Sequence, residues 1–157
     1  MKEQTADTFV QTLIEGYRDV PRFLALCRQC PRYGKVWTCP PFETNSTLHS
    51  QHSRLKLYAF TLEAGEDVDE ALVAIDARMR ALERNTPGSR CMVVRCVLCG
   101  KQPCSRVNGE PCRHPSMMRV SLEAMGFDVE AIARDFLGIE LQWGEGAPLT
   151  FVTALFY

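Results

Sequence analysis

Leu55-Lys-Leu-Tyr-Ala-Phe-Thr-Leu62 carries the clearest strand signal of this 157-residue chain. Its second half is apolar on both faces, which is typical of a strand inside a sheet rather than at an edge. Asp67 and Glu70 then form an N-cap pair at the start of an amphipathic helix. Apolar residues follow in alternating steps of four and three, at Val68, Leu72, Ile75, Met79 and Leu82. We therefore predict an internal strand followed directly by a helix.

Capping residues, breakers and apolar periodicity predict seven further elements. They are helices over 5–17, 21–26, 116–125 and 128–138, and strands over 91–97, 139–143 and 149–156. The turn Gly144-Glu-Gly146 predicts that the last two strands form a hairpin. This order favours an α/β or α+β sandwich in which helices cover one mixed sheet of about four strands. From its length, we expect the chain to form a single domain over 1–157.

The composition is that of an ordinary soluble globular protein, with 46% hydrophobic and 24% charged residues. No apolar run approaches the length of a membrane span. The N-terminal segment over 1–17 is polar and acidic with an amphipathic pattern, which argues against a signal or transit peptide. We therefore expect a cytoplasmic protein that makes no contact with a membrane.

Seven of the eight cysteines lie in two blocks that show no helical or strand period. The first block, a loop over about 27–53, contains Cys27, Cys30 and Cys39. The second block, a loop over about 96–115, contains Cys96, Cys99, Cys104 and Cys112. Each block begins with two cysteines separated by two residues, so that both thiolates can turn toward one metal. Because the cytosol keeps thiols reduced, we expect metal ligands rather than disulfides.

The two blocks differ in how completely they could enclose a metal. The second block offers four thiolates, enough for a zinc site or a [4Fe-4S] cluster. The first block offers three, so a fourth ligand must come from Cys91, His49 or His52, or one iron stays open to a small molecule. Cys91 has an alternative role as a buried apolar thiol of its own strand.

A third arrangement is a single zinc ion bound by the two closely spaced pairs. It would use Cys27, Cys30, Cys96 and Cys99. The other three cysteines of the blocks would then have no role. Ligand counts therefore favour iron–sulfur clusters of the [4Fe-4S] type, with zinc as the alternative.

Both cysteine blocks are locally basic, although the net charge of the chain is −1. Between Cys27 and Cys39 the chain contains Arg28, Arg32 and Lys35 and no acid, and such cations can offset the negative charge of a thiolate cluster. Arg113 and His114, beside the last cysteine of the second block, can donate hydrogen bonds to sulfur. The chain as a whole is not basic, which argues against a nucleic-acid partner.

Two signatures resemble those of a known family. The first is Phe23-Leu-Ala-Leu-Cys27-Arg-Gln-Cys30-Pro-Arg-Tyr-Gly-Lys-Val-Trp-Thr-Cys39-Pro-Pro-Phe42. The second combines Cys96-Val-Leu-Cys99, Cys104, Gly109-Glu-Pro-Cys112-Arg-His-Pro115 and Ser121-Leu-Glu-Ala-Met-Gly-Phe-Asp-Val129. Together they resemble the predicted metal-binding proteins of domain of unknown function 2284, which implies a cysteine-bound metal of the iron–sulfur kind. The second block of that family is tighter than this one, which makes Cys104 the least secure ligand.

These features predict a cytosolic protein that carries one or two [4Fe-4S] clusters and passes electrons to or from a redox partner protein. The sequence shows no nucleophile and base pair, no glycine-rich phosphate loop and no zinc hydrolase motif, so an enzymatic activity stays an open question. One alternative is an enzyme that binds a small molecule at an open iron of the three-cysteine cluster. Another alternative is a zinc-stabilised structural or interaction module.

Overall fold

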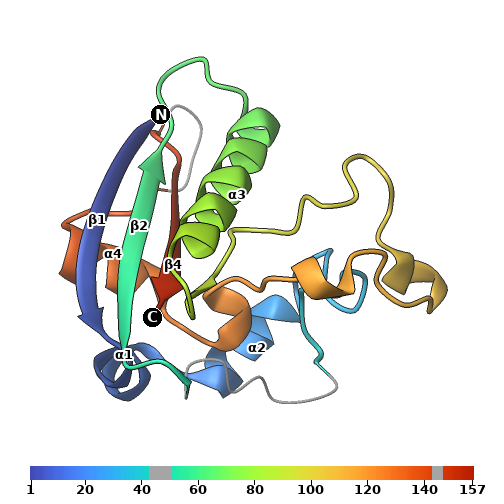
Figure 1. Ribbon diagram of the computed structural model, residues 1–157, viewed down its shortest axis with the longest axis horizontal. Helices are drawn as coiled ribbons and strands as arrows, with labels where there is room; N and C mark the ends of the chain where they lie inside the picture. The colour runs from blue at the N-terminus through green and yellow to red at the C-terminus, as the bar shows by residue number, and fades with distance from the viewer. Residues whose placement is uncertain (43–50, 143–146) are drawn as a thin grey trace.

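A computed structural model describes residues 1–42, 51–142 and 147–157, which form an open four-stranded sheet with helices on both faces (Figure 1). The strands are β1 (Lys2–Phe9), β2 (Arg54–Thr61), β3 (Arg90–Cys91) and β4 (Thr150–Phe156). The helices are α1 (Val10–Tyr17), α2 (Val20–Cys27), α3 (Val68–Asn85) and α4 (Val129–Leu137). The sheet has the order β1-β2-β4-β3, and each neighbouring pair is antiparallel. The α+β class is confirmed, but the described strands form an antiparallel sheet rather than the expected mixed one.

β2 lies inside the sheet, as its sequence predicted, with β1 on one side and β4 on the other. Its side chains alternate between the two faces of the sheet. Leu55, Leu57 and Ala59 enter one buried core, whereas Tyr58 and Phe60 enter a second core. Both faces of this strand are therefore covered, which explains why its apolar residues do not alternate with polar ones.

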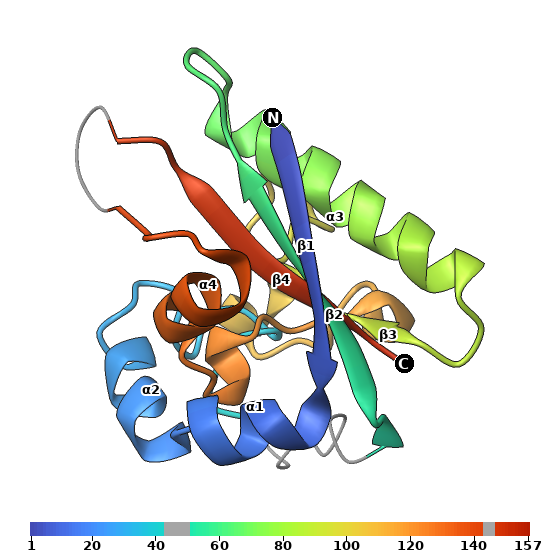
Figure 2. The ribbon, with the colours of Figure 1, turned by 90° about the vertical axis from the view of Figure 1, so that its left-hand side faces the viewer.

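The two cores lie on opposite faces of the sheet (Figures 1 and 2). α3 covers one face and contributes Ile75 and Met79 to the smaller core. α1 and α4 cover the other face, where Leu13 and Ile132 are almost completely buried. The larger core extends toward the segment that precedes α4, because Leu122 belongs to it as well.

Helix ends agree with the prediction where capping residues mark them. Asp67 accepts a hydrogen bond from the backbone N–H of Glu70 at 2.9 Å, and Asp128 accepts one from Ala131 at 3.0 Å. These bonds satisfy backbone donors that the first turn of a helix leaves free. α4 ends at Gly138, whose φ of 66° lies in the left-handed region that glycine tolerates.

The helix predicted over 5–17 is wrong in its first half. The chain forms β1 up to Phe9, and only the residues from Val10 onward are helical. β1 pairs with β2 along its whole length, from Lys2 opposite Thr61 to Phe9 opposite Arg54. Residues 2–9 therefore form a strand despite the helical spacing of their apolar residues, because hydrogen bonding to the edge of β2 outweighs the local helix propensity.

The strand predicted over 91–97 is shorter than expected, because β3 ends at Cys91. Met92 still donates a backbone hydrogen bond to Ala154 of β4, at 2.7 Å. The next residue, Val93, donates instead to Val120, at 3.0 Å. The chain therefore leaves the sheet at this point and runs toward the second cysteine block.

The helix predicted over 116–125 is replaced by two short 3₁₀ turns, Pro115–Met117 and η4 (Glu123–Met125). Arginine side chains from α3 and β3 donate hydrogen bonds to backbone carbonyls that would accept from the backbone in a helix. Arg80 donates to the carbonyl of Met117 at 2.8 Å, and Arg90 donates to that of Met118 at 3.2 Å. The segment is consequently held in an irregular path against the sheet.

The C-terminal hairpin is confirmed only for its second strand, which is β4. Residues 139–142 form no strand, and the backbone N–H of Ile139 instead donates to the carbonyl of Ala133 within α4. Trp143 and the predicted turn over 144–146 lie outside the described residues.

Candidate metal centre

The seven cysteines of the two blocks line two neighbouring cavities. The first, the three-cysteine cavity, has a volume of about 190 Å³ and is lined by Cys27, Cys30 and Cys39. The second, the four-cysteine cavity, has a volume of about 240 Å³ and is lined by Cys96, Cys99, Cys104 and Cys112. The division into three and four follows the two blocks of the sequence. All eight cysteines of the chain are free thiols.

The first block is a succession of tight turns that begins where α2 ends, at Cys27. The backbone N–H of Cys30 bonds to Cys27, and that of Cys39 bonds to Val36, each at 3.0 Å. Gly34 donates to Pro40 at 2.9 Å and thereby closes the loop. Its φ of 70° is one that L side chains rarely adopt, so glycine suits this closure. These turns bring all three thiols to one cavity.

The second block also consists of tight turns closed by backbone hydrogen bonds. Gly100 bonds to the carbonyl of Val97, and Gln102 bonds to that of Cys99, each at 3.1 Å. A 3₁₀ turn over Ser105–Asn108 then reverses the chain and ends at Gly109, which has a φ of 70°. The reversal returns the last cysteine of the block to the first two.

Arg106 of the second block binds the first block directly. Its guanidinium donates to the carbonyls of Val36 at 2.9 Å, Cys39 at 2.7 Å and Pro41 at 2.6 Å. It also stacks over the ring of Trp37, 5.0 Å from the centroid. Arg106, together with the hydrogen bond that Nε1 of Trp37 donates to the carbonyl of Glu110 at 3.0 Å, therefore holds the loop that carries Cys39 against the four-cysteine block.

Replacing Arg106 by Met should loosen the first block. A hydrogen bond to a charged group contributes about 1.5–3 kcal/mol, so the loss of even one should raise the population of the open block about tenfold. Trypsin should then cleave after Arg32 and Lys35 about ten times faster than in the wild type. Arg106→Lys should behave similarly, because one ammonium cannot reproduce the planar fork.

Lys101→Met is the matched control for this experiment. Lys101 is an exposed cation of the same block and makes no hydrogen bond among the described residues. Its loss should leave cleavage after Arg32 and Lys35 at the wild-type rate. Unchanged cleavage in Arg106→Met would show that the guanidinium does not hold the two blocks together.

Arg32 and Thr38 line both cavities and so form the wall between them. Thr38 is only 5% exposed. The Nε atom of Arg32 is buried and has no hydrogen-bond partner in the described part of the chain. A buried donor without a partner is costly, and a negatively charged group in either cavity would compensate it.

Several donors approach the sulfur atoms of the four-cysteine cavity. The guanidinium of Arg113 lies 3.7 Å from Sγ of Cys99, and the backbone N–H of His114 lies 3.4 Å from Sγ of Cys112. Burial raises the pKa of Cys96, and a backbone hydrogen bond from Leu98 opposes that rise. These donors favour the thiolate form that a metal requires. The sequence had suggested sulfur contacts for Arg113 and His114, but His114 makes its contact through the backbone.

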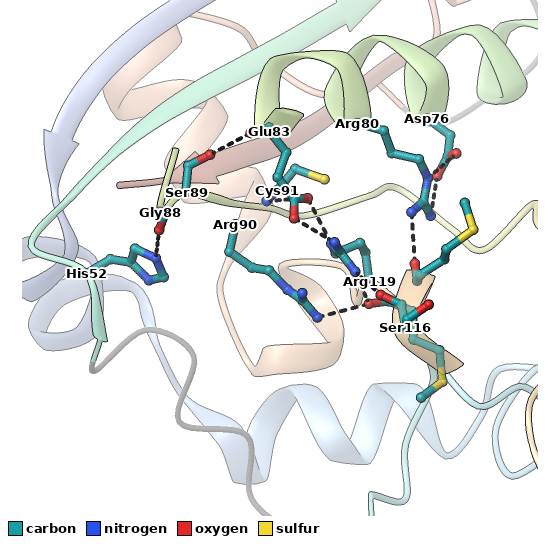
Figure 3. A network of polar contacts seen from close by, with 12 residues as sticks. His52, Asp76, Arg80, Glu83, Gly88, Ser89, Arg90, Cys91, Ser116 and Arg119 are labelled. Atoms are coloured by element: carbon teal, nitrogen blue, oxygen red, sulfur yellow. Dashed lines mark hydrogen bonds and ion pairs between the residues drawn. The ribbon is translucent and has the colours of Figure 1, made fainter. Parts of the chain in front are cut away.

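Cys91 lies apart from both cavities, in the core between the sheet and α3. Its side chain is fully buried, and its backbone N–H donates to the carboxylate of Glu83 at 3.2 Å (Figure 3). Burial, together with the neighbouring Glu83, raises the pKa of the Cys91 thiol to about 12. The position of Cys91 therefore agrees with its alternative role as a buried apolar thiol of the core.

The histidines named as possible fourth ligands line neither cavity in the described residues. Nε2 of His52 lies 3.0 Å from the carbonyl oxygen of Gly88 (Figure 3), and its ring packs edge-on against Phe156. His49 lies outside the described residues. The three-cysteine cavity therefore receives no fourth ligand from the candidates that the sequence offered and the structure describes.

Glu123 lines the three-cysteine cavity and was not singled out from the sequence. Glu123 belongs to η4, where the sequence predicted a helix over 116–125. Nothing in a helical pattern would distinguish this glutamate from a solvent-facing one. The contact depends on how η4 packs beside α2, so no local pattern could reveal it. Arg106 was missed for a similar reason, since its partners lie about 65 to 70 residues earlier in the chain.

The thiols surround the two cavities rather than a single point. In the described residues, no three Cys, His, Asp or Glu side chains are already gathered closely enough to hold one ion. In a zinc site each thiolate would lie about 2.3 Å from the ion, so the thiols would have to move together and close the cavity between them. Cavities of about 190 and 240 Å³ are several times the roughly 30 Å³ share of one water molecule. The donor set and the space therefore fit a group larger than a single ion.

A family model described as "Predicted metal-binding protein (DUF2284)" matches residues 18–157. The chain belongs to this family. The match spans both cysteine blocks and the sheet from β2 onward, and it confirms the resemblance noted in the sequence. No curated protein and no solved structure matches the chain. Among the described residues, no helix has the length and apolar character that crossing a membrane would require.

Proposed function

We propose that this member of the metal-binding family is a cytoplasmic iron–sulfur protein that holds two [4Fe-4S] clusters and exchanges electrons with a partner enzyme. The observation that carries the proposal is the gathering of seven thiols around two adjoining cavities, three around one and four around the other. Clusters of this kind are bound mainly by cysteine thiolates.

The chemistry that such clusters supply is reversible one-electron transfer. The chain contributes the thiolates, the cations and the exclusion of water. Arg32 stands between the two cavities, and its positive charge would partly compensate the anionic groups on both sides. Arg113 would do the same for the four-cysteine cavity through Cys99. Cation contacts and hydrogen bonds to sulfur favour the more negative, reduced form of a cluster.

The wall that the two cavities share favours a role in electron transfer over a role as two independent structural metal sites. Of the residues that the structure describes, Thr38 and Arg32 are the two that line both cavities, so groups held in the cavities would be neighbours. Cys30 is exposed, which brings the edge of the three-cysteine cavity to the protein surface. An electron could therefore enter or leave at Cys30 and pass across the wall. This arrangement suits a carrier that meets a partner protein at the face containing the first block.

Anaerobic purification with metal and sulfide analysis tests the proposal directly. We expect a brown protein with about eight iron and about eight acid-labile sulfide per chain after reconstitution. Visible absorbance should bleach on reduction and return on oxidation. Stoichiometric zinc without sulfide, after the same anaerobic reconstitution, would refute the electron-transfer proposal and identify a zinc-stabilised module instead.

A further inference from the structure

Glu123 is a carboxylate placed among thiols. It lines the three-cysteine cavity together with Cys27, Cys30 and Cys39. The cavity is otherwise walled by apolar groups such as Val93 and Ala124, by polar Ser121 and Thr38, and by the cations Arg32 and Arg95. Glu123 is half-buried, and a carboxylate that is partly withdrawn from water is stabilised by a cation or a metal beside it.

The position of Glu123 is fixed by how η4 meets the N-terminal half of α2. The backbone N–H of Asp19 donates to the carbonyl of Gly126 at 2.8 Å, and Nε of Arg18 donates to that of Met125 at 2.9 Å. A Cβ on Gly126 would lie 2.8 Å from a side-chain carbon of Val20, so the two segments are in close contact. Glu123 is therefore held beside the helix that ends at Cys27.

In the part of the chain that the structure describes, no cation is paired with this carboxylate. Among the described residues, Glu123 forms no ion pair. Arg95, which lines the same cavity, is paired with Asp69 instead. Glu123 and the three thiols thus line one cavity, in which a bound cation would attract all four groups.

We propose that Glu123 is the fourth protein ligand of the three-cysteine site. This inference rests on the proposed function and completes it, because the first block would then enclose its cluster with three thiolates and one carboxylate. Carboxylate oxygen is an established ligand for iron. The site is closed by the protein, and the small-molecule position of the enzyme alternative is taken by the Glu123 side chain.

The test uses the full chain, reconstituted anaerobically, with three substitutions. Glu123→Gln removes the charged ligand, Glu123→Cys supplies a thiolate in its place, and Glu110→Gln removes an exposed acid from the second block as the matched control. Ferricyanide is the oxidant. It takes one electron from a cluster whose weakly held iron then leaves as Fe²⁺, and the three-iron product is detected by EPR.

We expect Glu123→Gln to lose about one iron per chain and to give the three-iron signal about ten times faster than the wild type. Glu110→Gln should match the wild type. Glu123→Cys should resist the loss and should show a lower reduction potential for one cluster, because thiolate replaces a less electron-donating ligand. That potential shift requires only that Glu123→Cys folds, so the proposal stays testable if Glu123→Gln does not.

Two results would overturn the inference in distinguishable ways. If the wild type contains both clusters while Glu123→Gln keeps its iron and Glu123→Cys keeps its potential, the carboxylate is not a ligand and the proposed function stands. If the wild type contains zinc without sulfide, the proposed function fails and the inference fails with it.

Discussion

Replacing Cys104 by Ala should remove about half of the iron and sulfide, from about eight to about four of each per chain. Cys104 lines the four-cysteine cavity with the other three cysteines of its block. A [4Fe-4S] cluster with a missing thiolate is easily lost, since no histidine or acid of the described residues lines this cavity as a substitute. The measurement is iron and sulfide per chain after anaerobic reconstitution, together with visible absorbance.

Cys91→Ala is the matched control, because Cys91 is also a single thiol but lies in the sheet core away from both cavities. It should retain all the iron. The pair of variants separates ligands from buried thiols within one protein. Full iron content in Cys104→Ala would remove this residue from the ligand set. Loss of a cluster in Cys91→Ala, with the fold intact by circular dichroism, would contradict the position that the structure gives Cys91.

Glu83→Gln should lower the free energy of unfolding by about 3 kcal/mol, because it breaks a buried ion pair and leaves the charge of Arg119 uncompensated. Arg119 donates to the two carboxylate oxygens of Glu83 at 2.8 and 2.5 Å, and the two side chains are 11% and 15% exposed (Figure 3). The same carboxylate accepts the backbone N–H of Cys91. The pair thus ties α3 to β3 and to the irregular segment before η4. Thermal unfolding should show a Tm about 10 °C lower.

The exposed ion pair between Glu3 and Arg78 supplies the control on the same helix. Its two hydrogen bonds are each 3.2 Å long, but Arg78 and Glu3 are 48% and 34% exposed. Glu3→Gln should therefore change the free energy of unfolding by less than about 1 kcal/mol. An effect of Glu83→Gln no larger than that of Glu3→Gln would show that the buried network does not stabilise the fold.

The contribution of Glu83 should depend on pH in a defined window. Burial acts to raise the pKa of Glu83, but the bonds from Arg119 and Cys91 outweigh it and lower the pKa from 4.5 to about 2. Because the folded-state pKa lies below the ordinary value, the stabilisation is complete above pH 4.5 and is lost as the pH falls toward 2. The difference in stability between wild type and Glu83→Gln should shrink over this range. A constant difference between pH 5 and pH 2.5 would contradict it.

The elements that were predicted correctly are those whose signals are local. The strand over 55–62 carries its own apolar pattern, and Asp67 and Asp128 cap helices through bonds to residues three positions away. The errors share a different cause. β1 is a strand because β2 offers it an edge, and the segment over 116–125 is irregular because arginines from elsewhere take its carbonyls. Such contacts join residues far apart in the chain, so no window of sequence contains them.

The sequence by itself predicted a metal bound through cysteines, because the spacing within each block allows neighbouring thiolates to turn toward one site. It also indicated the family, which the family match confirms, and the grouping of the cysteines into three and four, which the lining of the two cavities repeats. Only the tertiary structure decided which further groups lie beside those thiols. Arg106 joins the two blocks, and Arg32 lies between the cavities. Glu123 lines the three-cysteine cavity, and Cys91 is buried in the core. The physical reason is that ligand spacing is a property of a few adjacent residues, whereas enclosure and charge compensation depend on long-range packing.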